Sequence, residues 1–182
     1  MSAVVPMTTA RRLDRADGLA VAEKRYLIDA IRTPWVPGDF RRIMDGQPAD
    51  ALALAPSAGD LDDYLGPLKI AASSPPDPRP SILMVGMLVD AFPNSRASGA
   101  FIDAATHDAV SMGFTPYDIA TACQRLRRGS KFLPSIAEFL DECARAKRTT
   151  ESAISLAERM RDRLEQARLA VAQHGDPNEP RP

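Results

Sequence analysis

The chain has few of the residues that mark a redox, metal or membrane role. Of its 182 residues only two are cysteines, Cys123 and Cys143, and no histidine is near either one. Without a C-x-x-C pair, this favours buried free thiols over a disulfide or a metal site. No run approaches the roughly 20 apolar residues of a membrane span, and the start, MSAVVPMTTARR, lacks the apolar stretch of a signal peptide. We therefore expect a cytoplasmic protein without metal or other cofactor.

An excess of charge of one sign is also missing. The chain has 23 basic and 24 acidic side chains, which leaves a formal net charge of −1. A protein with this balance does not bind nucleic acid as a polycation, so any contact with phosphates must come from a local cluster. Aromatic residues are scarce at 5%, but the apolar share of 45% is sufficient for a core.

Motifs for catalysis are absent too. The sequence contains no G-x-x-x-x-G-K-[ST], no G-x-G-x-x-G and no H-E-x-x-H, which removes the usual signatures of nucleotide hydrolysis and zinc-hydrolase chemistry. His107 and Asp108 are adjacent in a predicted helix, so their side chains do not face each other. The acidic group Asp60, Asp62 and Asp63 lacks the further ligands of a calcium loop and is typical of a helix N-terminus. We expect no enzyme.

What the sequence does contain is a dense set of helix signals in residues 115–140. Thr115, Pro116 and Asp118 predict an N-cap, a first helical position and a capping box, and Gly129 predicts the helix stop. Ser135 and Glu138 form a second box. The apolar positions follow 3,4 spacing, which predicts one buried face on each helix; they are Ile119, Ala122, Cys123 and Leu126, then Ile136, Phe139, Leu140 and Cys143.

The same signals along the chain predict an all-α fold. It comprises a compact bundle of four short helices with an N-terminal helical extension and a long C-terminal amphipathic helix. Two helices of the bundle are expected at 82–92, apolar almost all round, and at 99–112. The predicted parts are residues 1–72, a helical segment with a disordered start and a loop at 46–59; the Pro-rich linker 73–80; the four-helix domain 81–147; the amphipathic helix 149–173, capped by Thr149 or Thr150; and the disordered tail 174–182.

The predicted C-terminal helix has an apolar stripe and charged remaining faces. Its central members are Leu156, Met160 and Leu164. Such a helix does not bury its stripe alone, so it folds back on the domain, pairs with a copy of itself, or docks in a groove of a partner. In the last case these three residues are the expected partner-binding anchors.

One basic cluster stands out, formed by Arg125, Arg127, Arg128 and Lys131, with no acidic side chain between Asp118 and Glu138. Cations at a helix C-terminus complement its dipole, which is a sufficient structural explanation. The functional alternative is contact with nucleic-acid phosphates or with an acidic partner. A base-reading helix-turn-helix is disfavoured, because the second helix presents Glu138, Asp141 and Glu142.

Residues 83–140 also resemble a known family. The matching positions are Leu88, Phe92, Pro93 and Asn94, then Ile119, Cys123 and Leu126, then Phe132, Pro134, Ser135, Ile136, Ala137 and Glu138. The pattern is similar to the small phage and prophage replication proteins that load or inhibit the hexameric replicative helicase. It implies a four-helix domain with 149–173 as the candidate helicase-binding segment. Unlike those proteins, this chain has some 80 residues in front of the domain.

Three functions therefore stay open at the level of sequence. The resemblance implies a non-catalytic accessory protein of DNA replication that binds a hexameric helicase. The basic cluster suggests a DNA-binding or other nucleic-acid-binding regulator. The C-terminal helix suggests a phage structural or assembly protein that forms homo-oligomers through residues 150–173.

Overall fold

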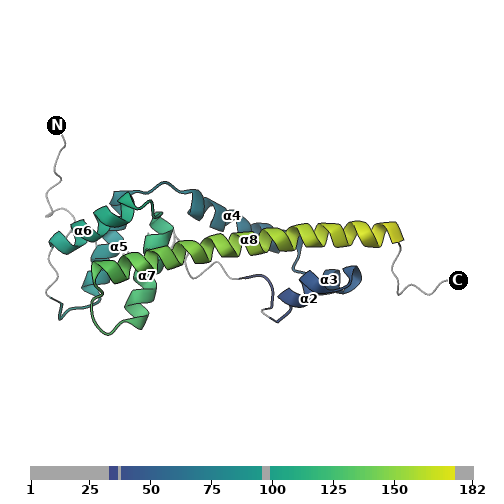
Figure 1. The fold of residues 1–182 in the computed structure, drawn as a ribbon, viewed down its shortest axis with the longest axis horizontal. Helices are drawn as coiled ribbons and strands as arrows, with labels where there is room; N and C mark the ends of the chain where they lie inside the picture. Colours follow the sequence, from purple (N-terminus) through teal and green to yellow (C-terminus); the bar gives the residue numbers. More distant parts are fainter. Residues whose placement is uncertain (1–32, 37, 96–98, 175–182) are drawn as a thin grey trace. The chain divides into compact units, whose positions relative to one another are not determined.

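The computed structural model describes residues 33–36, 38–95 and 99–174, and these residues form seven helices and no strand (Figure 1). The all-α class predicted from the sequence is confirmed. Within the N-terminal segment, the sequence also predicts an amphipathic helix that begins after Asp17 and ends before Pro34. Nearly all of that stretch, and the tail after His174, lie outside the described residues. The helices are α2 (Phe40–Asp45), α3 (Pro48–Leu54), α4 (Ala58–Ser73), α5 (Pro78–Asp90), α6 (Gly99–Ser111), α7 (Pro116–Gly129) and α8 (Ile136–His174).

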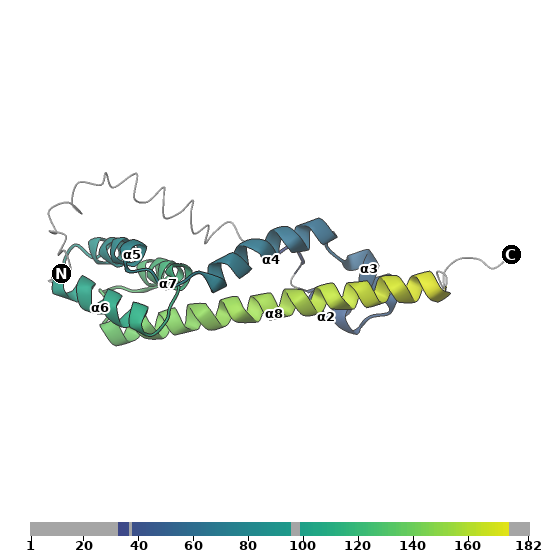
Figure 2. The same ribbon diagram turned by 90° about the horizontal axis from the view of Figure 1, so that it is seen from above.

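The described residues fall into two compact units, which we call unit 1 and unit 2. Unit 1 contains residues 71–147, and unit 2 contains residues 33–70 together with 148–174. In unit 1, α5 packs against both α6 and α7, and Figure 2 shows these three helices beside the first part of α8. Its buried core is formed by Met84, Val85, Leu88, Ala105, Ala109, Phe114, Ile119, Ala120, Ala122, Cys123, Phe139 and Cys143.

The start of α7 has the predicted capping box. The backbone N–H of Asp118 donates to Thr115 Oγ1 at 3.2 Å, and the N–H of Thr115 donates to Asp118 Oδ2 at 2.9 Å. The end of α7 differs from the prediction: Gly129 belongs to the helix, and Ser130 caps it in an extended conformation with φ −95°. The glycine with positive φ is Gly113, at 75°, in the turn between α6 and α7, where a residue without Cβ is favoured.

The largest difference from the sequence prediction is the continuity of α8. The Ser135–Glu138 box opens it as expected, with the Ser135 N–H 2.7 Å from Glu138 Oε2. The predicted break near residue 148 is wrong, since a single helix runs from Ile136 to His174. Residues 141–153 contain no glycine or proline, so nothing interrupts the backbone hydrogen bonds. The fourth helix of the predicted bundle and the predicted C-terminal helix are therefore one element.

Proline-rich and proline-containing stretches are more helical than predicted. In the expected linker 73–80, α4 ends at Ser73 and α5 already begins at Pro78, with the Asp77 side chain accepting the N–H of Arg79 at 2.9 Å. In the expected loop 46–59, Pro48 opens α3. Proline fits these positions because the first N–H groups of a helix have no acceptor within it.

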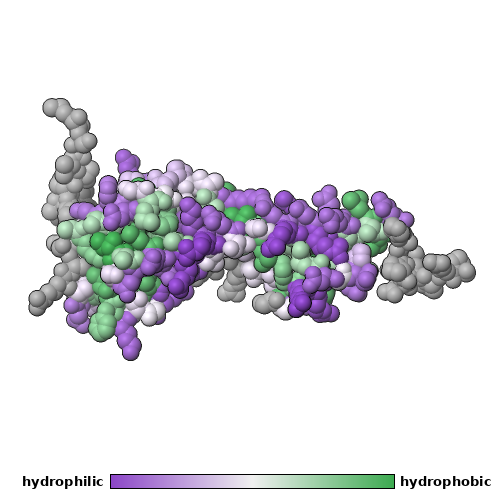
Figure 3. Space-filling model, in the orientation of Figure 1, coloured by the Kyte–Doolittle hydropathy of each residue, from purple (hydrophilic) through white to green (hydrophobic). Residues whose placement is uncertain are grey.

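Helix α5 is buried on one face only. Met84, Val85 and Leu88 are in the core of unit 1, whereas Ile82 and Leu83 are 40% and 42% exposed. A helix that is apolar almost all round, as the sequence gives for residues 82–92, is expected to be buried between its neighbours, and this expectation is wrong. Figure 3 shows hydrophobic residues gathered over α6 and hydrophilic residues along the middle of α8.

Unit 2 has its own small core. The ring of Trp35 meets that of Tyr64 edge to face at 5.3 Å. Arg163 of α8 donates to the backbone carbonyls of Met44, at 3.2 Å, and Gly46, at 2.5 Å, and these bonds hold the α2–α3 connection. The other large buried side chains of this unit are Ile43, Leu61, Leu65, Leu68, Met160 and Leu164. None of the helices within the described ranges is long and apolar enough to cross a membrane.

Candidate functional site

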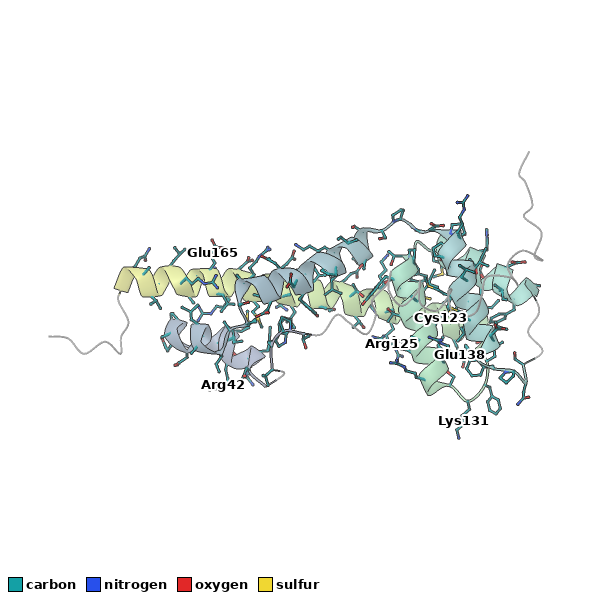
Figure 4. The ribbon with its side chains drawn as sticks, turned by 180° about the vertical axis from the view of Figure 1, so that it is seen from behind. Arg42, Cys123, Arg125, Lys131, Glu138 and Glu165 are labelled. Carbon is teal, nitrogen blue, oxygen red and sulfur yellow. The ribbon has the colours of Figure 1, made fainter. Side chains whose placement is uncertain are left out.

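The predicted basic cluster is not assembled into one surface. Arg125 lies against α8, with Nη1 3.3 Å from Glu142 Oε1. The same carboxylate is 3.6 Å from Arg145 through its other oxygen. Figure 4 shows Arg125 beside the helices and Lys131 on the turn that follows α7, pointing away from them. Arg125 is thus engaged within unit 1.

Arg127 lies on a different face of α7 from Arg125. Successive residues of a helix are rotated by about 100°, so Arg127 cannot share a face with Arg125. It is half-buried, and its Nε is enclosed without a hydrogen-bond partner in the described part of the chain. Arg128 and Lys131 are exposed. Of the four predicted nucleic-acid-binding residues, Arg127 is thus the half-buried one, and Arg125 is exposed but paired with Glu142.

The predicted partner-binding anchors of the C-terminal helix are mostly inside unit 2. Met160 is 0% exposed, Leu164 is 1% exposed, and Leu156 is half-buried. Two polar contacts fix this part of α8 to residues 33–70: the ion pair of Lys69 with Glu158, at 2.7 Å, and the bonds of Arg163 to backbone carbonyls. The sequence left open whether this helix folds back on the domain, pairs with a copy of itself or docks in a partner; in the structure it continues the last helix of the domain, and residues 33–70 of the same chain pack on it. These residues are not presented as a stripe for a partner.

A different feature stands out at the turn between α7 and α8. Phe132 is 82% exposed, the highest value among the exposed large hydrophobic residues that the structure describes. Its neighbours are anchored, because Pro134 is buried and Leu133 packs on the core of unit 1. The N–H of Ser130 donates to the carbonyl of Leu126 at 2.9 Å and closes α7. The turn is thus held in place by its neighbours, while the ring of Phe132 is exposed to solvent.

Beside this turn is a depression of about 490 Å³, which we call the turn–α8 depression. Its lining combines apolar side chains of α7 and the turn with charged side chains of α8. The residues are Leu126, Ser130, Lys131, Phe132, Leu133, Pro134, Glu138, Asp141, Glu142 and Arg145.

The carboxylates of this lining differ in the hydrogen bonds and ion pairs that they already form. Glu142 receives Arg125 and Arg145. The backbone N–H of Ser135, and next its hydroxyl, donate to Glu138 Oε2 and hold the pKa of Glu138 below its ordinary value. Asp141 is exposed, and within the described ranges it has neither a hydrogen bond nor an ion pair. Among the acidic side chains of this lining, Asp141 is therefore the one most available to accept a cationic group.

The reactive groups of unit 1 are enclosed. Burial raises the pKa of the Cys123 thiol to about 12 and raises that of Cys143 as well, so neither is a thiolate near neutral pH. Both are free, as the sequence predicts. The described residues contain no group of three or more His, Cys, Asp or Glu side chains placed to hold a metal ion.

Sequence reasoning used Phe132 only as part of a family resemblance and did not identify the depression. The sequence does contain a usable signal. Phe132 lies between Lys131 and Leu133 in a turn, with a helix end before it and a capping box after it. It therefore belongs to the buried face of neither helix. The pocket itself depends on the packing of α7 against α8, which spacing does not reveal.

A scan against protein-family models and searches of curated proteins and solved structures found no match for the chain.

Proposed function

We propose that the chain is a non-catalytic accessory protein of phage-type DNA replication that binds a hexameric replicative helicase as a loader or inhibitor. The proposal rests on the resemblance over residues 83–140. In the structure, the resembling residues of the turn have identifiable roles: Ser135 and Glu138 cap α8, Pro134 is buried, and Phe132 projects.

The observation that carries the proposal is the exposure of Phe132. A phenylalanine that is 82% exposed contributes little to folding, whereas aromatic residues are enriched at the centres of protein interfaces. Burying such a ring in a partner stabilises the complex by about 2 kcal/mol. Because capping bonds hold the turn at both ends, little conformational entropy is lost on binding.

The proposed binding element therefore moves from Leu156, Met160 and Leu164 to the α7–α8 turn. The buried residues of α8 then serve unit 2, and the turn meets the helicase. The bound protein acts by favouring or blocking one arrangement of the helicase ring, and it catalyses no reaction of its own.

The test is a binding measurement between the full chain and the purified hexameric helicase of the same host, by sedimentation velocity. We expect a complex with the wild type and about tenfold weaker binding with Phe132→Ala. Met112→Ala is the matched control, since Met112 is an exposed apolar residue (57%) away from the turn. Absence of a complex with the wild type would refute the proposal.

A second candidate, single-stranded nucleic-acid binding, is favoured by one observation: Lys131 is exposed directly beside Phe132. Stacking of bases on an aromatic ring with a cation at the phosphates is a common mode of such binding. The nearby carboxylates of Glu138 and Asp141 oppose it by repelling phosphates. Fluorescence anisotropy with labelled oligothymidylate tests it, with Lys131→Ala and Arg128→Ala expected to weaken binding and to reduce its salt dependence.

A further inference from the structure

We infer that the turn–α8 depression docks a segment of the partner that combines an apolar side chain with a lysine or arginine. The inference deepens the proposed function and rests on it, because the helicase supplies this segment.

The apolar half of the site is built by the turn. Leu126, Leu133 and Pro134 contribute partly or fully buried side chains, and Phe132 adds an exposed ring. A volume of about 490 Å³ lies in the range of pockets that accept small ligands, roughly 300 to 1,000 Å³. It therefore admits apolar side chains of an approaching segment rather than a whole helix.

The charged half of the site determines the sign of the occupant. Glu142 is already neutralised by Arg125 and Arg145. Glu138 and Asp141 are three residues apart on α8 and thus share a face. The hydrogen bonds from Ser135 go to Oε2 of Glu138, and Asp141 is without an ion pair in the described part of the chain.

Lys131 also lines the depression, so these two carboxylates face one ammonium group there. The excess of carboxylate favours a further ammonium or guanidinium group over a phosphate or an acidic peptide. The occupant is therefore a basic segment of a protein. A nucleic acid at this site is the competing outcome that the experiment separates.

The experiment records backbone NMR spectra of the full, ¹⁵N-labelled chain during titration with three probes. Two are synthetic amphipathic peptides of about 15 residues, identical except that one carries lysine and the other glutamate at the charged positions. The third is oligothymidylate. We expect the lysine peptide to shift resonances between Leu126 and Arg145, and the glutamate peptide to leave them unchanged.

Two variants locate the site, and both substitute exposed residues whose folding is checked in the same spectra. Asp141→Lys and Phe132→Ala should each weaken binding of the lysine peptide about tenfold. Asp103→Lys is the matched control, because Asp103 is an exposed acid on α6 and should leave binding unchanged.

The inference is overturned if the lysine peptide does not bind, if both peptides bind equally, if the shifts lie elsewhere, or if oligothymidylate shifts the same resonances. Its failure is distinguishable from failure of the proposed function. Helicase binding that survives Asp141→Lys removes the docking site but leaves the function. A lysine peptide bound in the depression, without helicase binding by the wild type, does the reverse.

Discussion

The guanidinium of Arg125 on α7 reaches the carboxylate of Glu142 on α8, 3.3 Å from Nη1 to Oε1. Glu142 is the less exposed partner, with 12% of its side chain accessible against 40% for Arg125, and it also receives Arg145 at 3.6 Å. The contact spans 17 residues of sequence. It joins the helices that border the turn–α8 depression and removes one cation from the predicted basic cluster.

We predict that Arg125→Ala lowers the free energy of unfolding by about 1 kcal/mol, a value reduced for the screening of a pair that is partly exposed. Arg145→Ala should cost less, because its side chain is 69% exposed. Urea denaturation of Arg125→Ala, Glu142→Ala and the double variant measures the coupling. Strictly additive losses would show that the two side chains do not interact.

Glu138 should make the stability of unit 1 sensitive to acid. The Ser135 backbone N–H, and then its hydroxyl, lower the pKa of Glu138 below its ordinary value of 4.5. A carboxyl whose pKa is lower in the folded state stabilises the fold at pH above its unfolded pKa. That contribution is lost as pH falls through the folded pKa.

Glu138→Gln should therefore flatten the pH dependence of the urea midpoint over the acidic range, and the difference from wild type should disappear at the acid end. Ser135→Ala is the matched variant, since it removes the hydroxyl donor but keeps the carboxylate. A pH profile of Glu138→Gln that parallels the wild type throughout would contradict this role.

The helix starts of this chain were predictable because their causes are local. Thr115 with Asp118, and Ser135 with Glu138, each complete a capping box within four residues, so the sequence is sufficient to indicate them. The continuity of α8 was missed because Thr149 and Thr150 are good caps in isolation, but nothing before them ends the preceding helix. A cap signal places a helix start only where a break precedes it.

The candidate site was less predictable, since it depends on which surfaces packing leaves open. Met160 and Leu164 form a regular apolar stripe, but spacing does not reveal whether the chain itself or a partner covers it, and here unit 2 does. Charge clustering in sequence failed for a related reason. The helical rotation sends Arg125 and Arg127 in different directions, and Glu142, which neutralises Arg125, is distant in sequence.

Both cysteines should be protected from thiol reagents in the folded protein. Cys123 and Cys143 are 4% and 0% exposed, and burial raises the pKa of each thiol, to about 12 for Cys123. Near neutral pH we expect no modification of the native chain by a maleimide, and two modifications after unfolding in urea, counted by mass spectrometry. The labelling rate should follow the unfolded fraction. Rapid labelling of either cysteine without denaturant would contradict the packed core.

Met160 separates the two interpretations of the C-terminal half of α8. With 0% exposure, its truncation to alanine removes buried apolar contacts and leaves a cavity, so Met160→Ala should lower the free energy of unfolding by about 2 to 4 kcal/mol. Leu169→Ala is the matched control on the same helix, because Leu169 is 57% exposed and its loss should change stability by less than about 0.5 kcal/mol. Chemical denaturation followed by circular dichroism measures both.

If Met160→Ala leaves the denaturation curve unchanged but abolishes helicase binding, the residue is a partner anchor and the core of unit 2 does not hold it in solution. If it lowers stability and the folded fraction still binds helicase, the stripe belongs to the fold and the binding surface lies elsewhere, as proposed for the α7–α8 turn.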